Sequence, residues 1–141
     1  MRGIRVLAAP LGALFLAGCT MTCSSVGCAS EVLVDIDALT AAYRGDPLQS
    51  TLCLDDVCRT AAIDPRSVNL FATVPDDHEE GQPIRVSLSI TSGSRTLVDS
   101  SLDVVPAKIA PNGEKCGPIC WQSGLSVEDG RLVESRAPST A

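Results

Sequence analysis

Aromatic side chains are scarce in this chain of 141 residues, which has one Trp, one Tyr and two Phe. Sugar-binding grooves and base-stacking platforms use clustered aromatic faces, so this composition argues against both kinds of site. Basic residues are also few, because 11 Lys and Arg stand against 17 Asp and Glu, for a formal net charge of −6. An acidic surface repels polyanions, and we therefore expect no nucleic acid partner.

The sequence also lacks the motifs of several common catalytic sites. It contains no Gly-x-Ser-x-Gly elbow, no glycine-rich phosphate loop and no Cys-x-x-Cys pair. Its single histidine, His78, lies in an acidic run and would have to serve any Ser–His mechanism. We therefore expect a protein that is not an enzyme and has no cofactor. An enzyme without a recognisable motif stays open as an alternative.

The N-terminus has the composition of a secretory leader. Arg2 and Arg5 precede an apolar run over residues 6–17, which is shorter than the roughly 18 residues of a membrane-spanning helix. The run ends in Leu16-Ala17-Gly18-Cys19, which resembles a lipobox, the four-residue signal of bacterial lipoproteins. The alternative is an ordinary secreted protein in which Cys19 is a spare thiol.

The lipobox resemblance implies that residues 1–18 are removed as a lipoprotein signal peptide. Cys19 would then carry a diacylglycerol and further acyl chains such as palmitate, and would hold the protein on the extracytoplasmic face of the cell membrane. Without Arg2 and Arg5 the formal net charge becomes −8. Residues 19–27 are expected to form the lipidated N-terminus and a short tether, residues 28–135 one β domain, and residues 136–141 a disordered tail.

Alternating apolar and polar residues predict most of the domain to be strand. The clearest alternation covers residues 84–91, and other strands are expected at residues 31–37, 48–54, 57–62, 68–74, 96–105, 125–128 and 131–134. Residues 38–44 are expected to form one or two helical turns capped by Asp37. Pro106 and Pro111 are expected to end sheet pairing. Seven or eight short strands predict an antiparallel β-sandwich, for which an immunoglobulin-like topology is one option. A small barrel is the alternative.

Seven cysteines become six once Cys19 is assigned to the lipid, and six can pair completely. A two-residue turn at Asp55-Asp56 would place Cys53 opposite Cys58, close enough for a disulfide. The other four allow three connectivities, of which we favour bonds that tie the N-terminal segment to the 116–120 loop: Cys23, Cys28, Cys116 and Cys120. Zinc ligation is the rival interpretation, but an oxidising compartment favours disulfides.

Three features together resemble small actinobacterial lipoproteins with a disulfide-rich β domain. These are a cysteine before the first strand, the Leu52–Cys58 hairpin, and the late segment Pro111-Asn112-Gly113-x-x-Cys116-x-x-x-Cys120. The resemblance brings no activity with it. The anchor and the β domain instead favour a non-enzymatic binding or structural module of the cell envelope, with the membrane and another envelope protein as partners.

A carrier of a small ligand or metal cation is the second hypothesis. Asp76-Asp77-His78-Glu79-Glu80 places four carboxylates beside the only histidine, and such groups bind divalent cations when a loop folds around the ion. Neighbouring residues seldom converge on one ion, and turn residues flank the run. A solvated acidic loop without a metal is therefore the favoured interpretation.

Overall fold

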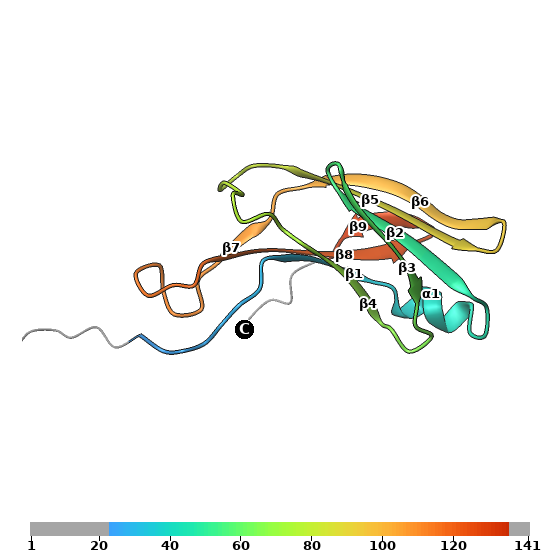
Figure 1. Cartoon of the computed structure of the whole chain (residues 1–141), viewed down its shortest axis with the longest axis horizontal. Coiled ribbons are helices and arrows are strands. Elements are labelled where there is room, and N and C mark those ends of the chain that lie inside the picture. Colours follow the sequence, from blue (N-terminus) through green and yellow to red (C-terminus); the bar gives the residue numbers. More distant parts are fainter. Residues whose placement is uncertain (1–22, 136–141) are drawn as a thin grey trace, which may run out of the picture.

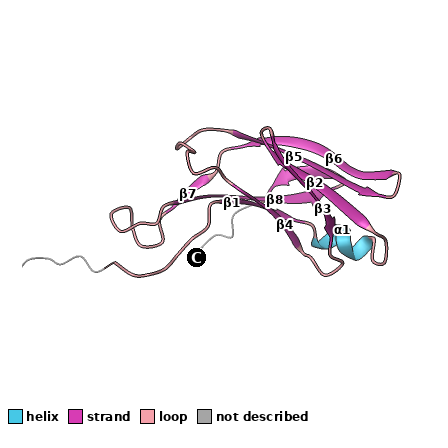
Figure 2. Cartoon of the chain, in the orientation of Figure 1, coloured by secondary structure: helices cyan, strands magenta, loops and turns pink. Residues whose placement is uncertain are grey.

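The computed structural model describes residues 23–135, which form two facing β-sheets and one short helix (Figure 1 and Figure 2). Cys19 and the expected tail at residues 136–141 lie outside the described residues. Sheet A contains β1 (Glu31–Asp35), β4 (Asn69–Thr73), β7 (Ala107–Ile109), β8 (Cys120–Glu128) and β9 (Arg131–Glu134). Sheet B contains β2 (Leu48–Leu54), β3 (Val57–Ile63), β5 (Ile84–Ser92) and β6 (Arg95–Val104). The expected sandwich is confirmed, and the alternative of a closed barrel is wrong.

Sheet B is antiparallel throughout, in the order β3-β2-β5-β6. The β2–β3 hairpin has the predicted register, with Leu54 opposite Val57 and Cys53 opposite Cys58. The alternation predicted for β5 is also confirmed, because its apolar face is buried: Ile84, Val86, Leu88 and Ile90. This strand order places β3 in one sheet with β2 and β5, which differs from the immunoglobulin arrangement.

Sheet A has the order β4-β1-β8-β7, with β9 also paired to β8. Its central strands, β1 and β8, are parallel, and Leu33 lies beside Gly124 in their register. The expectation of a purely antiparallel sandwich is therefore wrong at this pair. The two strands come from opposite ends of the domain, so no hairpin turn fixes their relative direction.

Two further expectations about sheet A are corrected. Pairing does not end at Pro106, because β7 forms between Pro106 and Pro111 and pairs with β8. As an edge strand, β7 tolerates flanking prolines that cannot donate a hydrogen bond. Strand β8 begins at Cys120, five residues before its predicted start. The prediction missed residues 120–124 because they show no apolar alternation.

Helix α1 (Asp37–Ala42) forms where helical turns were expected. Asp37 is its first residue rather than its cap, so that prediction is wrong. The Asp35 Oδ1 instead accepts a hydrogen bond from the backbone N–H of Asp37 at 2.9 Å. A carboxylate two residues upstream can make this contact because Asp side chains readily bond nearby backbone donors. No helix among the described residues is both long and apolar enough to cross a membrane.

Aliphatic side chains from both sheets form a single core between them. Its fully buried members include Val32 and Val34 of β1, Val86 and Leu88 of β5, and Leu125 of β8. On the β6–β9 side the sandwich is closed by a hydrogen bond from the Leu132 N–H to the Ser100 Oγ, at 3.0 Å. On the opposite side, β3 is exposed over most of its length. Because the core fills the space between the two sheets, a binding site is to be sought on their outward faces or on this open side.

Candidate functional site

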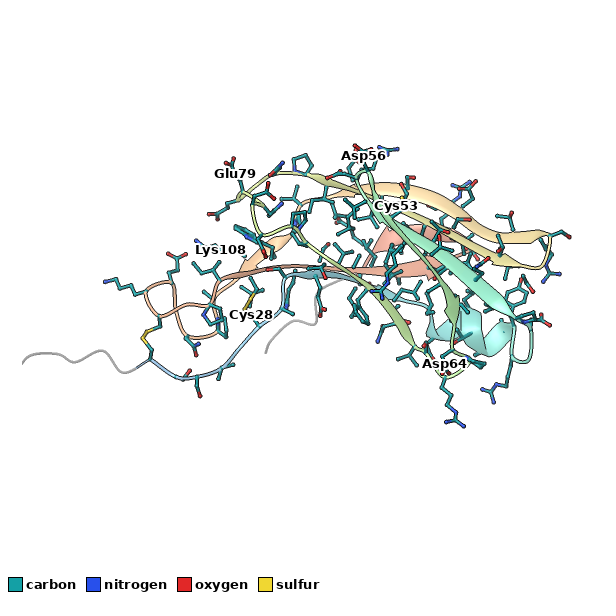
Figure 3. The ribbon with its side chains drawn as sticks, viewed as in Figure 1. Cys28, Cys53, Asp56, Asp64, Glu79 and Lys108 are labelled. Atoms are coloured by element: carbon teal, nitrogen blue, oxygen red, sulfur yellow. A yellow bond between two sulfur atoms is a disulfide. The ribbon has the colours of Figure 1, made fainter. Side chains whose placement is uncertain are left out.

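Two long-range disulfides fasten the N-terminal segment (residues 23–30) to the end of sheet A. Cys23 bonds Cys116, and Cys28 bonds Cys120, with separations of 93 and 92 residues in the chain. These are bonds of the favoured kind, between the N-terminal segment and the 116–120 loop. Figure 3 shows Cys28 at the base of the segment, where it meets the sheet. All six cysteines between residues 23 and 135 are thus in disulfides, since Cys53 bonds Cys58 across the β2–β3 hairpin.

Hydrogen bonds hold the same segment between its two disulfides. The Asn112 side chain contacts the hydroxyl of Ser24 and donates to the carbonyl oxygen of Val26 at 2.7 Å. Further along, the Gln122 amide donates to the carbonyl of Ala29 at 3.0 Å. Residues 23–27 were expected to be part of a tether, but the structure holds them against the domain. A free linker can therefore only precede Cys23.

The acidic loop lies beside this end of the sandwich, and its carboxylates are exposed while His78 turns inward. The His78 ring meets the edge of Trp121 with 5.0 Å between ring centroids, and its Nε2 atom is buried without a hydrogen-bond partner among residues 23–135. In Figure 3 the Glu79 side chain points outward, above Lys108. The sequence contained no signal for this ring contact.

Lys108 links the acidic loop to the disulfide-bonded loop. Its Nζ lies 3.0 Å from Glu114 and 3.7 Å from Glu80. The hydrogen bond and the charge of Glu114, followed by the charge of Glu80, raise the pKa of Lys108 above its ordinary value. Nowhere between residues 23 and 135 do three His, Cys, Asp or Glu side chains gather as metal ligands. The carrier hypothesis therefore gains no donor set from this loop.

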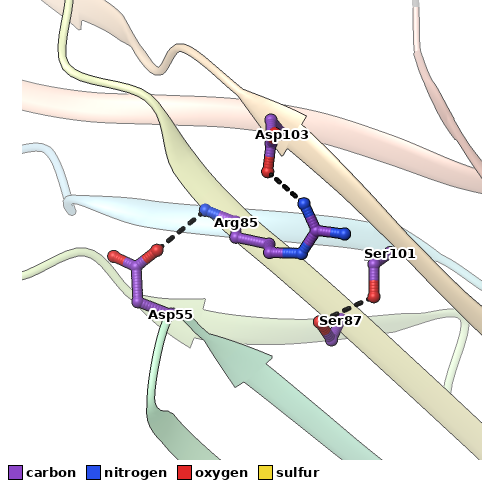
Figure 4. Close-up of polar contacts among 5 residues, drawn as sticks. All are labelled: Asp55, Arg85, Ser87, Ser101 and Asp103. Carbon is purple, nitrogen blue, oxygen red and sulfur yellow. Dashed lines mark hydrogen bonds and ion pairs between the residues drawn. The ribbon is translucent and has the colours of Figure 1, made fainter.

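The outward face of sheet B is polar, and several of its side chains pair across the strands. Arg85 forms an ion pair with Asp103 at 3.1 Å, and its backbone N–H donates to the Asp55 Oδ1 at 2.9 Å (Figure 4). Ser87 and Ser101 share a hydrogen bond of 2.8 Å on the same face. Such cross-strand pairs are ordinary for a solvated sheet face.

The outward face of sheet A differs, because it carries an apolar hollow of about 410 Å³. Its lining includes Leu33 of β1, Ala107 and Ile109 of β7, and Gly124 of β8. Leu33 is 38% exposed, whereas its neighbours in sequence, Val32 and Val34, are fully buried on the opposite face. The volume lies within the range typical of ligand sites, although this hollow is open to solvent along the sheet.

Gly124 creates the hollow by leaving the middle of β8 without a side chain. It lies between Leu33 on β1 and Ser135, whose backbone N–H donates to the Gly124 carbonyl at 2.9 Å. A Cβ added here would meet only the Cβ of Ser135, at the ordinary distance of 3.6 Å, and the backbone is not left-handed. Neither the local conformation nor the packing therefore requires glycine at this position.

Two carboxylates of β1 border the hollow at either end of Leu33. Glu31 and Asp35 line it, and no Lys or Arg does. The ion pairs found among residues 23–135 include neither of them. At about 3.3 Å per residue, the two positions lie roughly 13 Å apart along the strand. The surface thus presents an apolar floor between two negative charges.

The open side of the sandwich contains two smaller hollows, of about 230 and 200 Å³, between β4 and the β2–β3 hairpin. Phe71 and Arg59 line both of them.

In the part of the chain that the structure covers, no serine hydroxyl is bonded to His78, so no Ser–His pair is assembled there. The hollow on the outer face of sheet A suits binding. This hollow was not predicted from the sequence, and a glycine within an otherwise regular strand is the signal that could have pointed to it.

The sequence matches no protein-family model, no curated protein and no solved structure.

We predict that the two long-range disulfides stabilise the domain non-additively. While one is present, the other closes only the short ring formed by residues 23–28 and 116–120. Loop entropy then gives a loss of about 2–3 kcal/mol for removing either bond, but about 7 kcal/mol for removing both. The variants Cys23→Ser/Cys116→Ser and Cys28→Ser/Cys120→Ser, separately and combined, should be compared by urea unfolding. Single losses that sum to the combined loss would contradict the ring argument.

Proposed function

We propose that this protein is a membrane-anchored extracytoplasmic lipoprotein, and that its β domain binds another protein of the cell envelope without catalysing a reaction. The lipobox resemblance at Leu16-Ala17-Gly18-Cys19 supports the anchor. Three disulfides support an oxidising compartment outside the cytoplasm. The apolar hollow on sheet A supports binding, because it is a largely apolar depression that is open to solvent and is bordered by two carboxylates.

The observation that carries the proposal is the attachment of the N-terminal segment to sheet A at Cys23 and Cys28. With Cys23 fixed in the domain, only residues 20–22 separate the fold from a lipid on Cys19. Four residue steps reach at most roughly 14 Å. The domain therefore stays near the membrane surface, and its partner is a membrane protein or another anchored protein.

Charge gives the partner a further property. A formal net charge of −8 for residues 19–141 favours a partner with basic residues. Because much of this charge lies on exposed side chains, salt is expected to screen the attraction and to weaken association.

Lipidation is predicted at Cys19. Mass spectrometry of the mature N-terminus should find a cysteine that carries acyl chains, because the preceding residues fit a lipoprotein signal peptide. The variant Cys19→Ala should lose the modification and leave the membrane fraction. Cleavage at the same bond together with full membrane retention of Cys19→Ala would refute the anchor.

Membrane proximity is predicted to be necessary for function. A Gly/Ser tether of about 20 residues, inserted after Cys19, would move the domain outward by an average of roughly 25 Å without touching its disulfides. Its crosslinked neighbours in intact cells should change or disappear. The same tether added after Ala141 is the matched control and should change nothing. Identical neighbours in both proteins would show that proximity does not matter.

A further inference from the structure

We propose that the hollow over Gly124 is the partner-binding site, and that it receives an extended segment with basic residues at positions i and i+4 and a large apolar side chain at i+2. This inference rests on the proposed function and names the surface and the chemistry of its partner. It depends on three observations about sheet A, namely the position of Gly124, the spacing of two carboxylates and the contrast with sheet B.

The first observation is that neither the backbone conformation nor the packing requires a glycine at position 124. Glycine within a strand weakens it, and such a residue often marks a place where a ligand or another backbone approaches closely. A Cβ at Gly124 would make one ordinary contact, with the Cβ of Ser135 at 3.6 Å, and the backbone conformation suits any residue of a strand. A larger residue would project into the hollow beside Leu33. We infer that the absent side chain makes room for one that the partner supplies.

The second observation is the spacing of the charges. Glu31, Leu33 and Asp35 alternate along one face of β1, so that the apolar residue lies midway between the two carboxylates. A single small cation cannot contact two groups that lie roughly 13 Å apart. An extended chain has the same repeat as the strand, and its side chains at i, i+2 and i+4 also share one face. Basic groups at its outer positions then meet both carboxylates while the central side chain enters the hollow.

The third observation is that the other sheet face offers no comparable surface. On sheet B the outward face carries cross-strand pairs, such as Arg85 with Asp103 and Ser87 with Ser101. On sheet A, Glu31 and Asp35 form no ion pair within the described chain, no Lys or Arg lines the hollow, and the surface between the two carboxylates is mostly apolar. A partner segment with basic and apolar side chains would pair with the two carboxylates and would cover the apolar floor between them.

The test is a binding titration with the mature lipidated protein in detergent micelles. The probe is the fluorescein-labelled peptide Arg-Ser-Phe-Ser-Arg, and binding is followed by fluorescence anisotropy. Two control peptides carry the same label: Arg-Phe-Ser-Ser-Arg moves the apolar residue to the other face, and Glu-Ser-Phe-Ser-Glu reverses the charges. We expect the probe to bind at least tenfold more tightly than either control, and to lose most of its affinity in high salt.

Substitution of Gly124 separates a binding role from a folding role. Gly124→Val places a residue with high strand propensity at an unstrained position, so the melting midpoint should stay the same or rise. The same change fills the hollow and should weaken probe binding at least tenfold. Ala62→Val is the matched control, because it adds similar bulk to an exposed position of β3 in sheet B. Probe affinity within twofold of wild type in Gly124→Val would overturn the proposal.

The two carboxylates are tested in the same way. Glu31→Gln/Asp35→Asn should weaken probe binding severalfold while keeping the hydrogen bond from Asp37, since the Asn oxygen also accepts. Asp56→Asn/Asp99→Asn removes two exposed charges elsewhere and should have no such effect. If Gly124→Val fails to fold, Leu33→Asn decides the question: tenfold weaker binding supports the site, and unchanged binding overturns it.

Other occupants of the hollow are outcomes of the same experiments. A chain that ends at Ser135 and binds the probe tenfold more tightly would show that residues 136–141 cover the hollow, which overturns the proposal. Self-association of the wild-type protein that Gly124→Val abolishes would identify a second copy and would also overturn it. Failure of the probe to bind leaves lipidation of Cys19 and the effect of the inserted tether unchanged. The binding site and the anchored function therefore fail independently.

Discussion

The structure depends most on the pair of disulfides that joins its two ends. Cys23–Cys116 and Cys28–Cys120 fix the N-terminal segment beside the start of β8. This attachment places β1 parallel to β8 at the centre of sheet A, although the two strands are about ninety residues apart. Closing such a long loop costs conformational entropy in the unfolded chain, and covalent bonds remove part of that cost. A small core whose fully buried side chains are aliphatic benefits from this support.

The same attachment relates the anchor to the candidate binding surface. Residues 23–30 are held against the end of sheet A and are not a free linker. A lipid on Cys19 would therefore keep sheet A itself near the membrane. The outer face of sheet A contains the hollow over Gly124, with Glu31 and Asp35 at its border. The N-terminal segment that would lead to such an anchor and the hollow therefore belong to the same sheet. A partner on the membrane would meet the surface in a limited range of orientations, which lowers the entropy that binding has to overcome.

Local patterns predicted the fold wherever the signal lay within a single strand or hairpin. The alternation of β5 predicted its buried face, and the turn at Asp55 predicted the register of the β2–β3 hairpin, because hairpin register follows from short-range geometry. The parallel β1–β8 pair and the His78–Trp121 contact were not predictable, since each joins residues far apart in the chain. The hollow also escaped prediction. Gly124 is distinctive only after its neighbours Leu33 and Ser135 are known.

We propose that the N-terminal segment holds the domain on the membrane in a fixed orientation. In Figure 1 the 110–119 loop and the β5–β6 turn lie at opposite ends of the molecule. Distances from the bilayer can be measured by energy transfer from dyes placed on non-natural residues at Lys115 and Ser94, with the lipidated protein in vesicles. The account predicts that the dye at Lys115 lies close to the bilayer and that the dye at Ser94 lies far from it. Equal transfer from both positions would contradict it.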